Sequence, residues 1–353
     1  MTPAVETRGL SKHYGSVRAL DGVDVTIGAG EYFVLLGPSG GGKTTLLRTI
    51  GGFHRPTAGQ VLLHGQDVSD KPPEVRPTGM VFQAYALFPH MTVAQNVGYG
   101  LKLAKRPAAE AAQKVDAMLE TVGLTGLGGR KPHELSGGQQ QRVQLARALV
   151  LDRDILLLDE PLAALDAQLR KDMCLELKHL QQEVGITFIH VTHNQEEAMT
   201  VADRIALIAD GKLVEQGSAR EVYEAPRRRF TASFVGENNL LEGRITAAST
   251  DRVDVETGGG AITVPPVPGA SEGASASVSI RSELVALSGA ETAKLTGTYR
   301  ESVYLGLTTS HRIALTDGTE ITAREVSGTT PPPEPGATVH LTWPDAAARL
   351  HLD

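Results

Sequence analysis

The nine residues 37–45, which read GPSGGGKTT, constrain this chain more than any other part of its sequence. They fit the pattern G-x-x-x-x-G-K-[ST] and lie between the apolar run Tyr32–Leu36 and a helix-like segment. Small residues here let consecutive backbone N–H groups turn inward around phosphate oxygens, and a helix starting there adds the positive end of its dipole. We therefore predict a phosphate cradle made of Gly37, Pro38, Ser39, Gly40, Gly41, Gly42, Lys43, Thr44 and Thr45.

Two side chains of this loop have separate predicted roles. Lys43 supplies a positive charge to the β and γ phosphates, and Thr44 supplies a hydroxyl to Mg²⁺. The alternative is a flexible Gly-rich turn with no ligand. That alternative leaves the preceding strand pattern and the following helix pattern unexplained.

Three short apolar runs predict the sheet around this loop: Tyr32–Leu36, residues 155–158 and Thr187–Val191. Each run is continuous rather than alternating, as is typical of strands covered on both faces. Helical patterns lie between the runs, so we predict an α/β fold with a doubly wound, mostly parallel sheet. From about residue 88 to residue 150 no comparable strand pattern occurs, which indicates a helical insertion.

The composition and the hydrophobic pattern of the sequence change near residue 236. Beyond it, short segments rich in Thr, Val and Ile alternate with Gly, Asp-Gly and Pro turns, which predicts a small antiparallel barrel or sandwich. Residues 1–236 are electrically neutral, so the net charge of -7 belongs to residues 237–353. This acidic balance disfavours nucleic acid as a ligand. We expect two domains, 1–236 and 237–353, with a helical subdomain at about 88–150.

Composition excludes several classes of protein. With 41% hydrophobic residues the chain is too apolar to be wholly disordered. No run approaches the 18 apolar residues of a spanning helix, and the N-terminus lacks a secretion-signal pattern. The single cysteine, Cys174, excludes an internal disulfide and fits a reducing cytoplasm. We therefore expect a chain that is neither secreted nor membrane-spanning.

Two carboxylates end the second apolar run, in the sequence ILLLDEP. Asp159, at the carboxyl end of a buried strand, can hold the Mg²⁺ shell, and Glu160 can orient or deprotonate an attacking water. The alternative is a pair of solvated strand-end charges. The third run ends similarly at His193, whose imidazole could hydrogen-bond a γ-phosphate, although strand-end histidines more often only pack or lie in solvent. His190, inside that run, is interpreted as structural.

A second phosphate-binding pattern opens a helix in the sequence LSGGQQQR. Ser136 and the amides of Gly137 and Gly138, followed by Gln139, can present hydrogen-bond donors at a helix N-terminus. The alternative is an ordinary capped helix. One chain thus has two phosphate-binding patterns but one Mg²⁺ site. This is explained if two chains meet head to tail and each donates its second pattern to the nucleotide site of the other.

Together these motifs closely resemble the ATP-binding cassette (ABC) proteins. GPSGGGKT resembles their Walker A motif, ILLLDE their Walker B motif, LSGGQ their signature and AALD, ending at Asp166, their D-loop. His193 resembles the switch histidine, Gln83 the Q-loop glutamine that contacts the Mg²⁺ region, and Tyr14 the aromatic residue that stacks on adenine. The segment after residue 236 resembles the oligonucleotide-binding-like TOBE barrel of importer cassettes. Asn194, Ala163 and Ser282 depart from residues that are usual in the family.

The resemblance implies a function and partners. It implies a P-loop NTPase core, a second copy as head-to-tail partner, ATP and Mg²⁺ as ligands, and hydrolysis that drives two membrane permease subunits. An extracytoplasmic solute-binding protein would deliver the solute, and the chain would lie at the cytoplasmic face of the inner membrane. The tail favours polyamine import, with ferric iron, phosphonate, sulfate or sugar import as alternatives. Two other classes stay open: a non-transport cassette ATPase acting on nucleic acid or ribosomes, and a soluble phosphotransferase.

Overall fold

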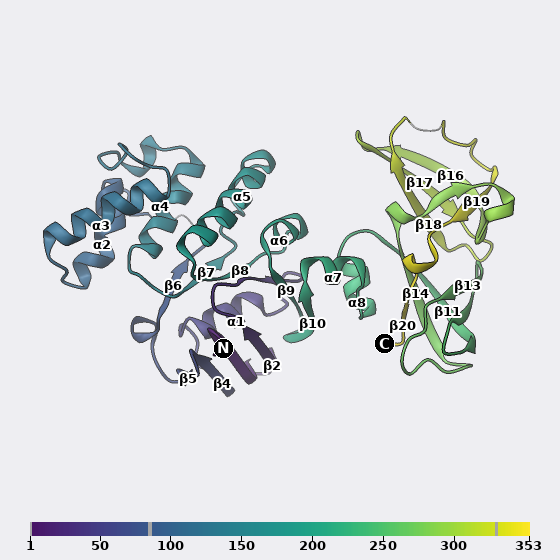
Figure 1. Cartoon of the computed structure of the whole chain (residues 1–353), viewed down its shortest axis with the longest axis horizontal. Helices are drawn as coiled ribbons and strands as arrows, with labels where there is room; N and C mark the ends of the chain where they lie inside the picture. Colours follow the sequence, from purple (N-terminus) through teal and green to yellow (C-terminus); the bar gives the residue numbers. More distant parts are fainter. Residues whose placement is uncertain (1, 84–86, 329–330) are drawn as a thin grey trace. The chain divides into compact units, whose positions relative to one another are not determined.

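The computed structural model describes residues 2–83, 87–328 and 331–353, and it forms two compact units, Met1–Arg220 and Glu221–Asp353 (Figure 1). The division precedes helix α8 (Arg229–Phe234), which packs against strands β11 (Asn238–Ala248) and β14 (Ser275–Arg281) of the second unit. The domain limits 1–236 and 237–353 stay a prediction. Among the described residues no helix is long and apolar enough to cross a membrane.

A six-stranded sheet at the centre of the first unit has the order β10-β9-β3-β8-β7-β6. The three predicted runs are its strands β3, β7 and β8; β8 pairs in parallel with both β3 and β7. Only β10 is antiparallel to its neighbour. The strands are β3 (Tyr32–Leu36), β6 (Thr78–Val81), β7 (Ile155–Asp159), β8 (Thr187–Val191), β9 (Arg204–Ala209) and β10 (Lys212–Ser218).

A second sheet in this unit, of order β2-β1-β4-β5, is antiparallel and was not predicted. Its strands are β1 (Val5–Tyr14), β2 (Val17–Ile27), β4 (Ala58–Leu63) and β5 (Gln66–Asp67). Buried residues of both sheets and of the first helix form one hydrophobic core, which includes Val23, Leu35, Leu46 and Leu157. The core fixes the edge of the central sheet from which the predicted site residues project.

The helices of the first unit match the predicted pattern. Between residues 88 and 150 the described residues form helices and no strand, as the insertion predicts, and α2, α3 and α4 gather at one end of this unit (Figure 1). The helices are α1 (Lys43–Ile50), α2 (Val93–Leu103), α3 (Ala108–Thr121), α4 (Gly137–Leu149), α5 (Ala167–Val184) and α6 (Gln195–Val201), with α7 (Ala219–Glu224) crossing the division between the units.

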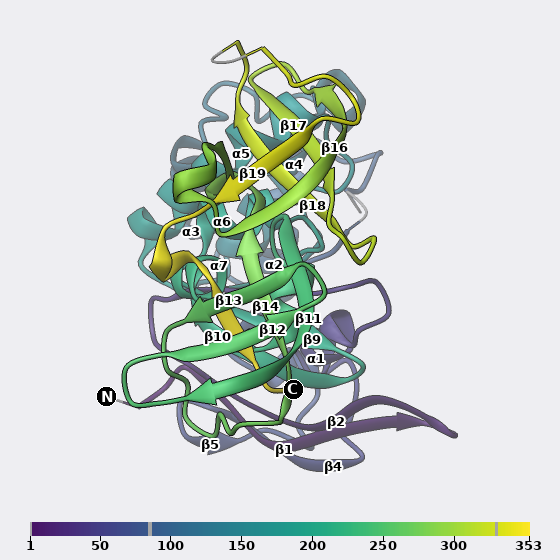
Figure 2. The ribbon, with the colours of Figure 1, turned by 90° about the vertical axis from the view of Figure 1, so that its right-hand side faces the viewer.

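The second unit consists of two antiparallel five-stranded sheets, visible in Figure 2. Their orders are β13-β12-β11-β14-β20 and β15-β19-β16-β17-β18. Side chains of both sheets, such as Ile245, Val278, Tyr299 and Ile313, share one core, as expected for a small all-β domain. The remaining strands are β12 (Val253–Thr257), β13 (Gly260–Val264), β15 (Ala286–Ser288), β16 (Leu295–Tyr304), β17 (Thr308–Ala314), β18 (Glu320–Val326), β19 (Thr338–Thr342) and β20 (Arg349–His351).

A buried arginine holds the C-terminal end of α1. Arg76 is 1% exposed, and its Nη1 donates to the carbonyls of Thr49 at 2.9 Å and Ile50 at 2.7 Å, while its Nε donates to Lys71 O at 2.8 Å. Burial lowers its pKa below the ordinary arginine value. The carbonyls that end a helix have no partner within the helix, so this guanidinium satisfies groups that are otherwise orphaned.

We expect Arg76→Met to destabilise the first unit. Losing two charged hydrogen bonds to buried carbonyls should lower the free energy of unfolding by at least about 3 kcal/mol. Thermal unfolding followed by circular dichroism or calorimetry measures the change. The matched control is Arg55→Met, because Arg55 is 76% exposed and pairs on the surface with Asp70, a contact of little energetic value. Equal stability of the two variants would contradict the role given to Arg76.

Candidate functional site

The loop between β3 and α1 requires glycine at two positions. Gly37 has a φ of 150° and Gly42 a φ of 106°. A Cβ atom on Gly37 would lie 2.0 Å from the carbonyl oxygen of Ile208, and one on Gly42 would lie 2.5 Å from that of Ala19. Only glycine fits these conformations at such close approach. The loop is therefore held against β9 and β2 with its amide groups next to an open cavity.

Lys43, the first residue of α1, folds back over this loop. Its side chain is 4% exposed, and its Nζ donates to the carbonyls of Gly37 and Pro38, both at 2.8 Å. Burial lowers the pKa of Lys43, and the nearby charges of Glu160 and Asp159 oppose that change. The ammonium group is thus fixed against the loop that the sequence predicts to be a phosphate cradle.

Thr44 and Asp159 meet at one point. Thr44 Oγ1 donates to Asp159 Oδ1 at 3.1 Å, and Arg48 Nη2 lies 3.2 Å from Asp159 Oδ2. Hydroxyl and carboxylate oxygens are the hard ligands that Mg²⁺ prefers, and Mg²⁺ is usually bound by one or two such groups together with phosphates and water. The donor set therefore fits Mg²⁺. Among the described residues no group of three or more His, Cys, Asp and Glu could hold a metal by itself, so phosphate oxygens and water would complete the shell.

Glu160 joins three distant motifs. Gln83 Nε2 donates to its Oε2 at 3.1 Å, and His193 Nδ1 lies 3.4 Å from its Oε1. Its backbone has a φ of 46°, uncommon outside glycine, and its N–H donates to Val191 O at 3.1 Å. The adjacent strand β8 thus fixes where this carboxylate leaves β7. Side chains from the residues that follow β6, β7 and β8 thus converge at the carboxyl edge of one sheet.

The phosphate loop lines a cavity of about 480 Å³, a volume within the range of small-molecule sites. Glu160 lies on its wall, and so do five residues that the sequence analysis did not identify: Val17, Arg18, Ala19, Asp210 and Gly211. The only sequence signal at the last two is an Asp-Gly turn, and Asp210 has a φ of 49°. The cavity contains Ser39, Gly40, Gly41, Gly42, Lys43, Thr44 and Thr45 in its lining.

Several predicted residues lie outside the cavity lining, among them those at the starts of α4 and α5. Ser136 is the exposed N-cap of α4, where its Oγ accepts from Gln139 N at 3.4 Å and Gln139 Oε1 accepts from Ser136 N at 3.0 Å. Asp166 caps α5 by accepting from Leu169 N at 3.0 Å. The described chain therefore does not bring Ser136 or Asp166 to its own phosphate loop, as a composite site between two chains requires.

Tyr14 also lies outside the lining of the cavity. The ring is 45% exposed, at the end of β1. Lys12 Nζ lies 5.0 Å from its centroid, and the ring of His54 meets it edge to face with centroids 5.9 Å apart. An exposed aromatic ring is available for stacking. His190, by contrast, is fully buried and hydrogen-bonded to the hydroxyl of Tyr32, and burial lowers its pKa to about 3.

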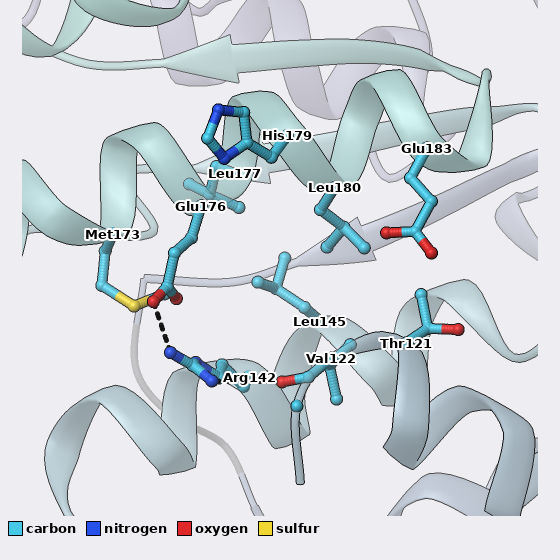
Figure 3. Close-up of a pocket in the computed structure, with 11 residues that line it drawn as sticks. Thr121, Val122, Arg142, Leu145, Met173, Glu176, Leu177, His179, Leu180 and Glu183 are labelled. Carbon is cyan, nitrogen blue, oxygen red and sulfur yellow. Dashed lines mark hydrogen bonds and ion pairs between the residues drawn. The ribbon is translucent and has the colours of Figure 1, made fainter.

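A separate cavity of about 260 Å³ lies between α4 and α5 (Figure 3). Leu145 of α4 faces Leu180 of α5, and an ion pair joins Arg142 to Glu176. Arg142 Nη1 also donates to Val122 O at 3.4 Å. No residue of the predicted phosphate or metal site lines this cavity, so we interpret it as a packing seam of the helix that carries Ser136.

The chain matches two known protein families. Residues 20–163 match the family model described as ABC transporter, and residues 278–350 match the model described as TOBE domain. A spermidine/putrescine import ATP-binding protein PotA from Ruegeria pomeroyi is 46% identical over 92% of this chain and 89% of its own length. The protein of the same name from Thermobifida fusca is 46% identical over 97% of this chain and 91% of its own length.

Two solved structures resemble part of the chain. CbiO1 from Clostridium perfringens, part of the ABC transporter complex CbiONQ, is 31% identical with a TM-score of 0.59, and the match covers 63% of this chain and 91% of that one. A dimeric ATP-binding cassette in a post-hydrolysis state with ADP and Pi is 33% identical with a TM-score of 0.54, covering 61% of this chain and 99% of that one.

Proposed function

The chain belongs to the ATP-binding subunits of ABC transporters, and from this premise we propose that it hydrolyses ATP to energise polyamine uptake through membrane permease subunits. The convergence of Gln83 and His193 on Glu160, beside the Lys43 loop, carries the enzymatic part of this proposal. The polyamine class rests on the spermidine/putrescine import proteins, which resemble the chain over nearly its whole length.

We assign the roles in hydrolysis to residues that line the cavity and to the side chains that contact Thr44 and Glu160 there. The amides of the loop and Lys43 bind the phosphates, and Thr44 and Asp159 would hold Mg²⁺, which neutralises phosphate charge when bound. Glu160 accepts a hydrogen bond from water and orients it toward the γ-phosphate, and it takes a proton as the water attacks. Gln83 and His193 hold the Glu160 carboxylate in that orientation and sense the γ-phosphate.

The second half of each site comes, in this proposal, from a second copy of the chain. Ser136, Gly137, Gly138 and Gln139 at the N-terminus of α4, with Asp166, would face the nucleotide held by the partner. This arrangement explains why a phosphate-binding helix start lies outside the chain's own cavity. The dimeric cassette with ADP and Pi supports a two-chain unit.

The permease subunits would contact the helical subdomain. A cavity of about 540 Å³ between α2 and α3 has side chains of both helices in its lining, among them Tyr99, Lys102 and Val115. The residues that line this cavity follow Gln83 in the sequence. In this proposal a movement of Gln83 at the nucleotide is therefore transmitted to the helical subdomain. The solute-binding protein would deliver solute to the permeases from outside, and the chain would stay at the cytoplasmic membrane face. Nothing in this proposal requires nucleic acid.

The substrate class is tested with vesicles that contain the chain, its cognate permease subunits and the solute-binding protein. We expect ATP-dependent uptake of labelled spermidine or putrescine that excess sulfate, phosphonate, ferric iron or sugar does not inhibit. Uptake of one of those solutes instead of a polyamine would replace the substrate class and leave the ATPase assignment in place.

We expect Tyr14→Ala to weaken ATP binding modestly. A stacked base contributes about 1 to 3 kcal/mol, by analogy with bases in nucleic-acid complexes, so affinity should fall by about 5-fold and at most about 150-fold. Tyr14→Phe is the matched control, because it keeps the ring and should bind ATP normally. Fluorescent-nucleotide titration measures both. Unchanged affinity in Tyr14→Ala would mean that Tyr14 makes no contact with the base.

A further inference from the structure

A chain of polar contacts, used by none of the motifs above, joins the loop before Asp166 to the loop that carries His193. It starts at Arg170, one turn into α5. Arg170 Nη2 donates to Leu165 O at 2.7 Å, and Nε lies 3.4 Å from Leu162 O. One guanidinium therefore holds the carbonyl of Leu165, inside the D-loop, and that of Leu162, the residue just before it. We call residues 162–166 the D-loop segment.

Glu197 of α6 forms an ion pair with Arg170. Its Oε1 lies 3.5 Å from Arg170 Nε, and its Oε2 accepts from Thr192 Oγ1 at 2.7 Å. The Glu197 side chain is only 6% exposed. Burial raises its pKa, while the Thr192 hydrogen bond and the charge of Arg170 act in the opposite direction. A carboxylate this buried is costly unless it is paired, so its position depends on Arg170 and Thr192.

Thr192 connects Glu197 to the backbone next to His193 by two hydrogen bonds of its hydroxyl group. Its Oγ1 accepts from the N–H of Asn194 at 2.9 Å, while Asn194 Oδ1 accepts from the N–H groups of Glu196 at 2.8 Å and Glu197 at 3.2 Å. His193 lies between Thr192 and Asn194, so its peptide is held on both sides. Asn194, which departs from the usual family residue, still caps α6.

On the basis of the proposed function, we propose that Arg170 and Glu197 are positioning residues that hold the D-loop segment in register with the His193 loop. His193 contacts Glu160 within one chain, while Asp166 faces the nucleotide of the partner chain in the proposed dimer. The Arg170–Glu197 contact links these two loops through the carbonyls that Arg170 holds and through Thr192. It would couple the state of one nucleotide to the placement of groups at the other.

The test uses Arg170→Met and Glu197→Gln in the full chain. Neither side chain lines the nucleotide cavity, so ATP KM and ATP affinity should stay within about twofold. The value of kcat should fall on the order of 10- to 100-fold, the effect of small misplacement of reacting groups. Arg170→Lys, which keeps the charge but lacks the fork of donors, should retain an intermediate kcat.

Two further variants separate positioning from general damage. Lys178→Met removes another cation of α5, one that pairs with Asp203 at 2.6 Å, and it should leave kcat unchanged. The double variant Arg170→Met/Glu197→Gln should be no slower than the slower single variant, because both break one link. A kcat like that of the unaltered chain, an additive loss or a raised KM would overturn the inference while the proposed function stands. An unaltered chain without ATP hydrolysis would overturn both.

Discussion

The Glu160→Gln variant should bind ATP as tightly as the unaltered chain and lose turnover by at least about 10²-fold, the usual contribution of a general base. Glutamine keeps the shape and can still accept a hydrogen bond from Gln83, but it cannot take a proton from water. Because ATP stays intact in the site, the two-chain form that ATP closes should accumulate. Phosphate release measures turnover, and gel filtration with and without ATP measures the trapped dimer.

The matched control is Glu196→Gln, the same chemical change on an exposed side chain of α6. It should hydrolyse ATP normally. Near-normal turnover in Glu160→Gln would remove this residue from the chemistry. Loss of ATP binding in the same variant would point instead to damage of the cavity wall.

Lys43→Ala should give the second large effect, a loss of ATP affinity. The ammonium group is buried and aimed at the cradle, and a hydrogen bond to a charged group contributes about 1.5 to 3 kcal/mol. Affinity should therefore fall roughly 10- to 100-fold, since each 1.4 kcal/mol is a factor of ten. Removing the Lys43 side chain also leaves the carbonyls of Gly37 and Pro38 without this donor, so the loop should become less ordered.

Titration with a fluorescent ATP analogue measures this loss, and Lys171→Ala on the exposed face of α5 is the control. ATP affinity equal to that of the unaltered chain would show that the phosphates lie away from Lys43. The same titration with ADP adds a check. The loss should be smaller for ADP, because the γ-phosphate contact is absent in both proteins.

The central sheet was predictable because β3, β7 and β8 are buried on both faces, which leaves continuous apolar runs in the sequence. The antiparallel sheet of β1, β2, β4 and β5 was missed for the opposite reason. Its strands alternate buried and exposed residues, as in the burial of Val23, Val25 and Ile27, and bulges interrupt β1. The bulges break the strict alternation by which a half-buried strand is identified.

At the site, the sequence motifs named the residues that lie together around Glu160. They did not indicate the contacts that fix the loops carrying those residues. The structure places Gln83, Glu160 and His193 together, although their individual roles in hydrolysis stay predictions. Arg170 and Glu197 lie in ordinary helical sequence, and only the fold brings α5 against α6. Arg76 is similar, because nothing in its local sequence shows that it ends 1% exposed at the end of α1. Contacts between distant segments leave no local signal.

The proposed function is tested most directly by measuring phosphate release from ATP by the purified full chain. We expect steady release that requires Mg²⁺ and disappears in Glu160→Gln. We also expect release to be lost when Ser136 is replaced by Arg. Mixing the Ser136→Arg chain with a Lys43→Ala chain should restore part of the rate, because one composite site in the mixed dimer is intact. ATP binding without phosphate release, or transfer of the phosphate to an acceptor other than water, would contradict the proposed function.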